Sequence, residues 1–319
     1  MKKLKALLLT EGMHGMISQV EGMAKALNTE YTHKIVRLNF PWNFIPPKFT
    51  PISQIVLKDK MYITNNEIPD LIISCGRKSV IPSIFLKRQN SKIFTIHIQD
   101  PKVSIDKFDL IVCPEHDGLK GNNVIRTIGA IHYLTEKEIL RENNYLKIDK
   151  ENKKIIAFIL GGPNKYYAFS DKEIDFLFNR IKTIFTRDKY KLIVVPSYRT
   201  PLNIIKKAFN SFGHDHMVIK EVDKKAYLSA LSISDYIVVT CDSTSMISEA
   251  AITGKPIYVA QMSAKKNNSR FQKFFSQFKQ LNIIKDLTDK IDLWSYDKLD
   301  EVNRISPMIN EKIKKNGII

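Results

Sequence analysis

The sequence is poor in cysteine and contains no long apolar run. Among its 319 residues are three cysteines, Cys75, Cys113 and Cys241, and no two of them form a CxxC pair. This number and spacing argue against a disulfide framework or a zinc site, so we expect three small buried residues in a reducing compartment. No stretch approaches the roughly 18–20 apolar residues that a membrane-spanning helix requires, so we expect no membrane-spanning helix.

The first residues of the sequence do not have the pattern of a targeting segment, and we expect none. It begins Met-Lys-Lys-Leu-Lys-Ala-Leu-Leu-Leu-Thr. The apolar part is about five residues long, too short for the core of a secretory signal, and no small-residue cleavage site follows. We therefore expect a buried first strand and a cytoplasmic protein, with peripheral attachment to the inner face of the membrane left open.

Acidic residues are scarce relative to basic ones. Lys and Arg number 50 against 33 Asp and Glu, which gives a formal net charge of +17. The excess is spread along the chain and favours anionic partners such as nucleotides, phosphorylated substrates or an anionic membrane surface. No nucleic-acid-binding motif accompanies it, so nucleic acid is not an expected partner. An AT-rich genome is an alternative explanation for the abundance of lysine.

Short apolar segments alternate with helical patterns through both halves of the chain. Segments such as Leu71–Cys75 and Tyr236–Cys241 do not alternate apolar and polar residues, which is typical of strands buried on both faces of a parallel sheet. The predicted fold class is α/β and GT-B-like, with two Rossmann-like domains whose parallel sheets face a central cleft. The expected strands are Ala6–Thr10, His33–Leu38, Leu71–Cys75, Ile93–His97, Leu110–Cys113, Val124–Thr127, Ile155–Leu160, Lys191–Pro196, Met217–Ile219, Tyr236–Cys241 and Pro256–Ala260.

A polar stretch near the midpoint suggests the domain boundary. Glu142–Lys154 is charged and has no apolar periodicity, so we interpret it as the linker. We predict an N-terminal acceptor domain over 1–145 and a C-terminal nucleotide-sugar domain over 152–296. Residues 297–319 include a helical pattern that could pack back on the first domain.

The strongest functional signal lies after the predicted strand Tyr236–Cys241. Ser243, Thr244 and Ser245 open a helix, and Glu249 follows Ser245 by four residues, on nearly the same helix face. Ligands of open parallel sheets bind beyond the carboxyl ends of the strands, and a helix N-terminus favours a diphosphate. Glu249 could then accept hydrogen bonds from ribose hydroxyls. The alternative is an ordinary N-cap at Ser243 with a solvated Glu249.

Two further loops of the second half have a suitable composition. Gly161-Gly162-Pro163-Asn164-Lys165 follows a predicted strand and could bring backbone amides and a lysine to a phosphate or sugar. Arg199 and Thr200 could clamp a phosphate, because arginine offers a bidentate fork. A tight turn with an exposed lysine, and a surface arginine, are the alternatives.

In the first half, glycine and charged residues also follow the strands. Gly12 and Gly15 frame His14, a candidate general base, although a plain loop histidine is equally compatible with the pattern. Arg77 follows another strand. His116 has acidic neighbours on both sides, but adjacent residues on one loop rarely give metal geometry, and no metal site is expected.

Two aromatic segments bear on partners. Phe40–Pro47 is rich in aromatic residues and proline, which suits an acceptor lip or a membrane-interface anchor. Phe271, Phe274, Phe275 and Phe278 share one helix face with basic residues nearby. This helix could lie on anionic lipid, whereas the preferred interpretation is a face directed into the core.

The order of these motifs resembles the mitochondrial-fission "elongate mitochondria" family, a GT-B glycosyltransferase-like group whose bacterial members are often labelled nucleoside-diphosphate-sugar epimerases. The matching segments are Thr10–Gln19, Ser74–Arg77, Gln99–Pro101, Pro114–Asp117, Gly161–Lys165, Arg199–Pro201 and Asp242–Pro256. Tyr198 departs from the family pattern, where an arginine is usual. The chain also lacks GxGxxG and a convincing YxxxK pair, so the epimerase label fits poorly.

The resemblance and the loops together imply a metal-independent glycosyltransferase without a cofactor. It would bind a nucleoside-diphosphate sugar in the interdomain cleft and transfer the sugar to an unknown acceptor, envelope-related or lipid-linked. The alternative is a non-catalytic scaffold with an unknown protein partner, related to the plant fission factor. The expected catalytic residues are His14 and Asp100. The expected substrate-binding residues are Gly12, Gly15, Gln19, Gly76, Arg77, Glu115, Gly161, Gly162, Asn164, Lys165, Arg199, Thr200, Asp242, Ser243, Ser245, Met246 and Glu249.

Overall fold

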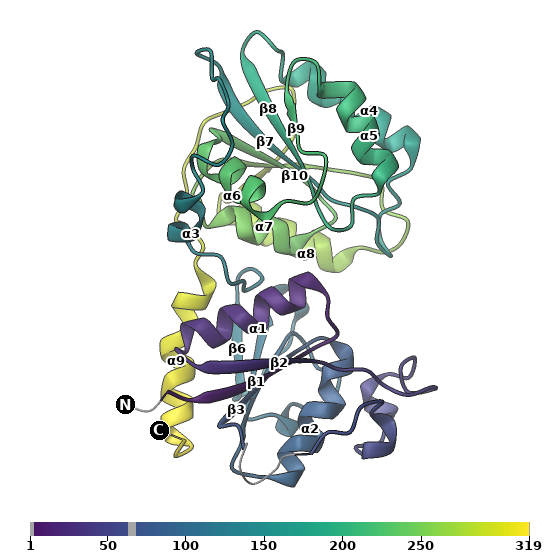
Figure 1. The fold of residues 1–319 in the computed structure, drawn as a ribbon, viewed down its shortest axis with the longest axis vertical. Coiled ribbons are helices and arrows are strands. Elements are labelled where there is room, and N and C mark those ends of the chain that lie inside the picture. Colours follow the sequence, from purple (N-terminus) through teal and green to yellow (C-terminus); the bar gives the residue numbers. More distant parts are fainter. Residues whose placement is uncertain (1–2, 63–67, 319) are drawn as a thin grey trace. The chain divides into compact units, whose positions relative to one another are not determined.

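The computed structural model describes residues 3–62 and 68–318, and the chain divides into two compact units (Figure 1). Unit 1 contains the described residues up to Tyr133 together with those from Asp300 onward. Unit 2 is Leu134–Leu299. Within the described residues, no helix is both long enough and apolar enough to cross a bilayer.

The boundary between the units lies ahead of the predicted linker. The 142–154 stretch belongs to unit 2 because its side chains and backbone bind helix α6 (Lys224–Ile233) and its N-cap. The Tyr145 hydroxyl donates to Asp223 over 2.7 Å, and the amide of Leu146 donates to Ser229 Oγ over 3.1 Å. A polar composition therefore marks a surface segment here rather than the point where one unit ends.

Unit 1 is a parallel six-stranded sheet with helices on its faces. The strand order is β2-β1-β3-β4-β5-β6, and every neighbouring pair is parallel. Strands β3, β4 and β5 are buried along their whole length, as the apolar runs predicted. The elements are β1 (Lys5–Thr10), α1 (His14–Ala26), β2 (Glu30–Ile35), η1 (Pro47–Phe49), η2 (Gln54–Val56), β3 (Leu71–Cys75), η3 (Arg77–Ser79), α2 (Val80–Gln89), β4 (Phe94–Ile98), η4 (Ile105–Lys107), β5 (Leu110–Pro114), η5 (Glu115–Asp117), β6 (Val124–Thr127) and α9 (Glu301–Lys315).

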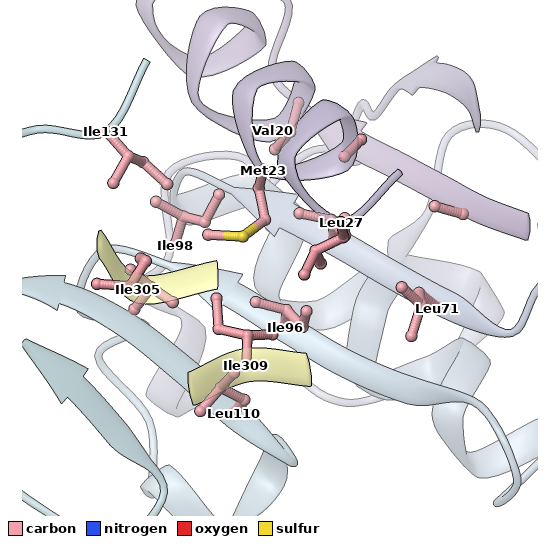
Figure 2. Packing of buried hydrophobic residues seen from close by; sticks show 14 of the residues in the cluster. Val20, Met23, Leu27, Leu71, Ile96, Ile98, Leu110, Ile131, Ile305 and Ile309 are labelled. Atoms are coloured by element: carbon pink, nitrogen blue, oxygen red, sulfur yellow. The ribbon is translucent and has the colours of Figure 1, made fainter. Parts of the chain in front are cut away.

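The last helix of the chain completes the core of unit 1. In Figure 2, Val20 and Met23 of α1 and Ile305 and Ile309 of α9 lie around Ile96 of β4. All five side chains are buried, and each such apolar residue contributes about 1.5–3 kcal/mol relative to an exposed position. Helix α9 is therefore an integral part of the unit, although its residues are about 170 positions or more after those of β6.

Unit 2 has the same architecture with a different strand order. Its sheet runs β12-β11-β10-β7-β8-β9, again with parallel pairs throughout. Strand β12 was not expected from the sequence, because only Ile284 of its three residues is apolar and buried. The elements are α3 (Glu136–Arg141), β7 (Lys154–Leu160), α4 (Asp171–Ile184), β8 (Tyr190–Pro196), α5 (Leu202–Phe212), β9 (Met217–Val218), α6 (Lys224–Ile233), β10 (Tyr236–Thr240), α7 (Thr244–Ala251), β11 (Ile257–Ala260), α8 (Ser269–Gln280) and β12 (Ile284–Asp286).

Aromatic residues fill the core of unit 2. The four phenylalanines Phe271, Phe274, Phe275 and Phe278 of α8 are all buried. The core-facing interpretation of this helix is confirmed, and the idea that the same face rests on lipid is wrong. Cys75, Cys113 and Cys241 are buried free thiols, as expected from the sequence.

Each sheet has one point at which the winding of the chain reverses. In unit 1 this point lies between β1 and β3, and in unit 2 it lies between β7 and β10. Helices that leave neighbouring strands in opposite directions open a crevice at the carboxyl edge, where ligands of doubly wound folds bind. These two points therefore define the places to look for a site, one in each unit.

Candidate functional site

The reversal point of unit 2 is organised around the buried carboxylate of Asp242. Its Oδ1 accepts from Thr240 Oγ1 over 2.6 Å, and its Oδ2 accepts from the amide of Gly162 over 3.2 Å and from Arg199 Nη2 over 2.6 Å. Asp242 is 2% exposed. Burial raises the pKa of its carboxyl group in spite of the adjacent Arg199 guanidinium. Asp242 thus links the loops that follow β7, β8 and β10.

The two glycines after β7 allow this close packing. A Cβ on Gly161 would lie 2.1 Å from Asp242 Oδ1, and one on Gly162 would lie 1.9 Å from the carbonyl oxygen of Arg199. The amide of Gly161 donates to Thr240 Oγ1 over 2.8 Å, and that of Gly162 donates to Asp242. Both amides bind neighbouring side chains rather than a phosphate, which corrects the role predicted for them.

Arg199 and Thr200 also act within the unit. Nη1 of Arg199 donates to the carbonyl of Gly162 over 2.9 Å while Nη2 pairs with Asp242, so the two prongs of the fork are already engaged. The hydroxyl of Thr200 lies 2.8 Å from the carbonyl oxygens of Leu160 and Gly161. Arg199 thus forms an ion pair within the unit, and its binding of a phosphate stays a prediction.

Asn164 and Lys165 complete the loop after β7. Asn164 Nδ2 donates to the carbonyl of Asp242 over 3.0 Å, and its Oδ1 accepts from the amides of Tyr166 and Tyr167. The Lys165 ammonium lies 4.7 Å from the centre of the Tyr166 ring. Asn164 shapes the turn, and Lys165 is an exposed cation beside it.

Helix α7 begins where β10 ends and has a side-chain cap. Ser243 Oγ accepts from the amide of Met246 over 3.3 Å, and the carbonyl of Ser243 accepts from the amide of Ile247. The N-cap at Ser243, which the alternative interpretation expected, is present. The amides of Thr244 and Ser245 come earlier in the helix and have no acceptor within it, since the first turn of a helix cannot supply one. Both residues are partly exposed at the carboxyl edge of the sheet.

Glu249 is not the solvated charge that the alternative interpretation expected. The hydroxyl of Tyr227 on α6 donates to its Oε2 over 2.9 Å. Burial raises the pKa of Glu249 from 4.5 to about 7, against the opposing effects of Tyr227 and Lys224. The carboxylate is consequently held in place by a neighbour and is easily protonated near neutral pH.

Glycines and a glutamate lie at the reversal point of unit 1. Glu11 Oε1 accepts from the amide of Lys78 over 3.0 Å, so the loops after β1 and β3 are joined. Gly12 and Gly76 have φ angles of +87° and +95°, which other residues rarely adopt. A Cβ on Gly76 would also lie 2.6 Å from the Met16 sulfur.

The remaining residues of this edge hold local contacts. Gln19 is buried and donates from Nε2 to the carbonyl of Gly15 over 3.0 Å. Arg77 donates to the backbone carbonyls of Ile45, over 3.0 Å, and Asn43. Arg77 therefore holds the segment around Asn43–Ile45 in place rather than presenting a free fork.

The two residues predicted to be catalytic lie in different surroundings. His14 is exposed at the start of α1, with its ring 6.5 Å from that of Tyr133 in an edge-on arrangement. The carboxylate of Asp100 accepts two hydrogen bonds from Lys102, one from the backbone amide over 2.9 Å and one from the ammonium over 2.5 Å. Their catalytic roles stay predictions.

Glu115 and His116 follow β5 in the short helix η5. Glu115 is exposed, whereas His116 is buried with Nε2 3.7 Å from Asp117 Oδ1. Across residues 3–62 and 68–318, no group of three or more His, Cys, Asp or Glu side chains is placed to hold a metal ion.

Two residues of the unit 2 site were not predicted from the sequence. Thr240 is fully buried and binds both Gly161 and Asp242, yet it reads as the last residue of a strand. Tyr227 precedes Glu249 by 22 positions and lies on another helix. Of the two, only Thr240 has a signal in the sequence, because it lies two residues before the Asp242–Ser245 run.

Relatives share the sequence over most of its length. An uncharacterized protein, RP120, from Rickettsia prowazekii is 25% identical over 92% of this chain and 95% of its own length. The mitochondrial fission protein ELM1 of Arabidopsis thaliana is 24% identical over 78% of this chain and 65% of its own length, so the chain spans slightly less than two thirds of that plant protein.

Solved structures share the fold at low sequence identity. MnaA of S. aureus, in a co-structure with UDP, matches with a TM-score of 0.56 and 14% identity over the whole of this chain and 98% of the other. The glycosyltransferase SnogD from Streptomyces nogalater matches with a TM-score of 0.54 and 11% identity over 98% of this chain and 96% of the other. The two Rossmann-like parallel sheets are therefore those of the GT-B fold.

A family model settles the relationship that the motifs suggested. It is described as mitochondrial fission ELM1, and it matches residues 14–313, a range that contains every strand of the two sheets except β1 and also most of α9. The protein belongs to the mitochondrial fission ELM1 family.

Proposed function

We propose that this protein binds a nucleoside-diphosphate sugar in unit 2, with the diphosphate at the start of helix α7. The observation that carries the proposal is the position of the Thr244 and Ser245 amides at the reversal point between β7 and β10. These amides and the helix dipole attract an anion, and the Ser245 hydroxyl adds a donor. MnaA, which shares the fold, was solved with UDP.

The nucleoside would be recognised by Glu249. Its side chain follows the helix start by one turn, and Tyr227 fixes the position of Oε2. Ribose hydroxyls are donors, and a carboxylate is the strongest acceptor a side chain offers them. Because Glu249 is easily protonated, nucleotide binding should strengthen as pH rises through about 7.

The same arrangement suits sugar transfer. The departing diphosphate would be stabilised by oriented amides, a contribution that needs no metal ion. His14 and Asp100 of unit 1 are the proposed groups for the acceptor hydroxyl, and the acceptor itself is proposed to be lipid-linked or an envelope precursor. This assignment makes the protein a glycosyltransferase.

A non-catalytic scaffold is the second candidate. The observation in its favour is that the Asp242–Arg199 pair is closed on itself, so much of the polar edge of unit 2 holds the unit together. The naming of the Arabidopsis relative as a fission protein points the same way.

A single amide can be removed to test the site. Thr244 is the first residue of α7, where proline is tolerated, and Ser243 already has the extended conformation, φ −138° and ψ 104°, that must precede proline. Thr244→Pro therefore deletes one donor with little change in fold. Asp171→Pro, at the corresponding position of α4, is the matched control.

The measurement is the melting temperature with UDP and UDP-sugars. At about 100 times the dissociation constant, a ligand should raise the melting temperature of the wild type by about 5–10 °C. The shift should persist in Asp171→Pro and largely disappear in Thr244→Pro. Absence of any shift with nucleoside diphosphates would reject the nucleotide site and favour the scaffold.

A further inference from the structure

One segment of unit 1 exposes large apolar side chains on an ordered loop. It follows β2 and is closed by an antiparallel bridge between Leu38 and Leu57, and we refer to it as the 38–57 loop. Asn39 Nδ2 also donates to the carbonyls of Ile55 over 2.9 Å and Leu57 over 3.2 Å. In Figure 1 the loop extends beyond α2, away from the sheet.

The inner side of the loop is tied to the unit. Val56 and Leu57 are buried in an apolar cluster against which Trp42 and Ile52 pack. The backbone carbonyls of the outer turn are held as well, by Arg77 and by the Thr50 hydroxyl, which donates to Pro46 over 3.0 Å. The loop is therefore a fixed structure, and its exposed residues are not exposed through lack of order.

Several large apolar side chains of the loop are exposed. Phe40 is 82% exposed, Phe44 75%, Phe49 69% and Ile55 71%. Single exposed apolar residues are common, but four on one closed loop of 20 residues form a concentration that folding alone does not require. Something other than the core of unit 1 is needed to explain them.

The charges of the loop and of the residue on each side of it are of one sign. Arg37, Lys48 and Lys58 are exposed, and the sequence contains no Asp or Glu from position 37 to position 58. The Lys48 ammonium lies 5.7 Å from the centre of the Phe49 ring, so this positive charge is next to an exposed aromatic side chain. Exposed aromatic residues in a segment with basic and no acidic residues are typical of segments that rest in the headgroup region of anionic membranes.

We propose that the 38–57 loop is a docking surface for an anionic lipid bilayer, a function beyond nucleotide binding. Phe40, Phe44 and Phe49 enter the boundary between headgroups and acyl chains, and the three basic residues pair with lipid phosphates. A second copy of this chain is a poorer occupant, because a symmetric contact would bring the same positive charges together.

The first test removes the rings. Phe40→Ser, Phe44→Ser and Phe49→Ser are combined, and sedimentation is measured with vesicles of phosphatidylcholine containing about one third phosphatidylglycerol. Each ring should contribute about fivefold to partitioning, so the triple variant should bind about 100-fold more weakly. The control combines Phe176→Ser, Leu202→Ser and Leu293→Ser, residues of unit 2 that are 68–77% exposed, and should bind as the wild type does.

The second test removes the charges. Arg37→Gln, Lys48→Gln and Lys58→Gln together should lower partitioning onto the anionic vesicles by about 100-fold, since each basic residue near such a surface adds about fivefold. Binding to pure phosphatidylcholine should not change. The control replaces three exposed lysines of unit 2, Lys172, Lys206 and Lys266, by glutamine.

All replaced residues are exposed, so melting temperatures should stay within a few degrees of the wild type and verify the fold. Three results would overturn the proposal. These are no sedimentation of the wild type with anionic vesicles, equal losses in the loop and control variants, and a concentration-dependent dimer that the ring variant abolishes without any binding to vesicles. The last result would assign the loop to a second copy.

Discussion

The carboxyl edges of the two sheets have similar residues, yet their polar side chains are used differently. In unit 2, Asp242 is buried and connects three loops through Thr240, Gly162 and Arg199. In unit 1, Asp100 is partly exposed and binds Lys102 of its own loop. The same residue type is thus a structural centre in one unit and a local contact in the other.

The difference teaches that a polar strand end is not by itself a ligand site. At the edge of unit 2 the glycine amides and the arginine fork are satisfied by the protein, because burial of Asp242 requires partners. What is left for a ligand is the start of α7 and the carboxylate of Glu249. The proposed site therefore includes fewer residues than the set of polar strand-end loops that predicted it.

The largest expected effect comes from Asp242→Ala compared with Asp100→Ala. Removing Asp242 deletes three hydrogen bonds, one of which is also the ion pair with Arg199, and should lower the free energy of unfolding of unit 2 by about 4 kcal/mol. Asp100→Ala should lower that of unit 1 by less than about 1 kcal/mol, since its ion pair is exposed.

Each unit has its own fluorescent reporter for this measurement. The chain has two tryptophans, Trp42 in unit 1 and Trp294 in unit 2. Urea unfolding is followed by Trp294 fluorescence in a Trp42→Phe background and by Trp42 fluorescence in a Trp294→Phe background. Equal losses for the two aspartate variants would contradict the distinction between the edges.

The next prediction compares a glycine required because there is no room for a Cβ with a glycine required by its positive φ angle. Gly162→Ala places a Cβ 1.9 Å from the carbonyl oxygen of Arg199, and should cost unit 2 about 3 kcal/mol because backbone must move. Gly118 of unit 1 has φ +76° but no atom within 4 Å of an added Cβ. Gly118→Ala should therefore cost only about 1 kcal/mol. A larger loss at Gly118, measured with the same two reporters, would reverse this ranking.

A third prediction concerns the pH dependence of unit 2. The pKa of Glu249 is raised by burial from 4.5 to about 7, so the folded state holds this proton more tightly than the unfolded state. The stability that Glu249 contributes is complete below about pH 4.5 and is lost as pH rises through 7. Glu249→Gln should match the wild type at about pH 4.5 and exceed its free energy of unfolding by about 3 kcal/mol at about pH 8.

The control for this experiment is Glu221→Gln, an exposed glutamate of the same unit. It should change the free energy of unfolding by less than about 0.5 kcal/mol at either pH. If Glu249→Gln gave the same difference from the wild type at both pH values, the buried position of the carboxylate would not be what governs its effect.

Much of the fold could be predicted because its signals are local. Runs such as Leu71–Cys75 are apolar at every position but Ser74, and they are strands buried on both faces. Strand β12 could not be predicted, because two of its three residues are charged and the pairing with β11 determines it. The polar stretch 142–154 misled for a related reason, since composition reports exposure and not which unit a segment packs on.

The sequence drew attention to several residues of the unit 2 edge but not to their pairing. The sequence singled out Arg199 and Asp242, yet nothing in it shows that residues 43 positions apart bind each other. Tyr227 left no signal, because its link to Glu249 depends on where α6 packs beside α7. Hydrogen bonds between distant residues follow from the three-dimensional arrangement, whereas a strand end or an N-cap is recorded in neighbouring residues.

The smallest expected effect links the edge of unit 1 to the 38–57 loop. Arg77 donates to the carbonyls of Asn43 and Ile45, so Arg77→Ala should cost unit 1 about 1 kcal/mol and loosen the outer turn of the loop. Hydrogen exchange should quicken by about tenfold at the amides of Phe44 and Thr50, whose acceptors lie in the same loop. Arg88→Ala, an exposed arginine at the end of α2, should leave these rates unchanged. Unaltered exchange in Arg77→Ala would mean that the buried residues beneath the loop suffice to hold it, and that Arg77 is free to serve another purpose at this edge.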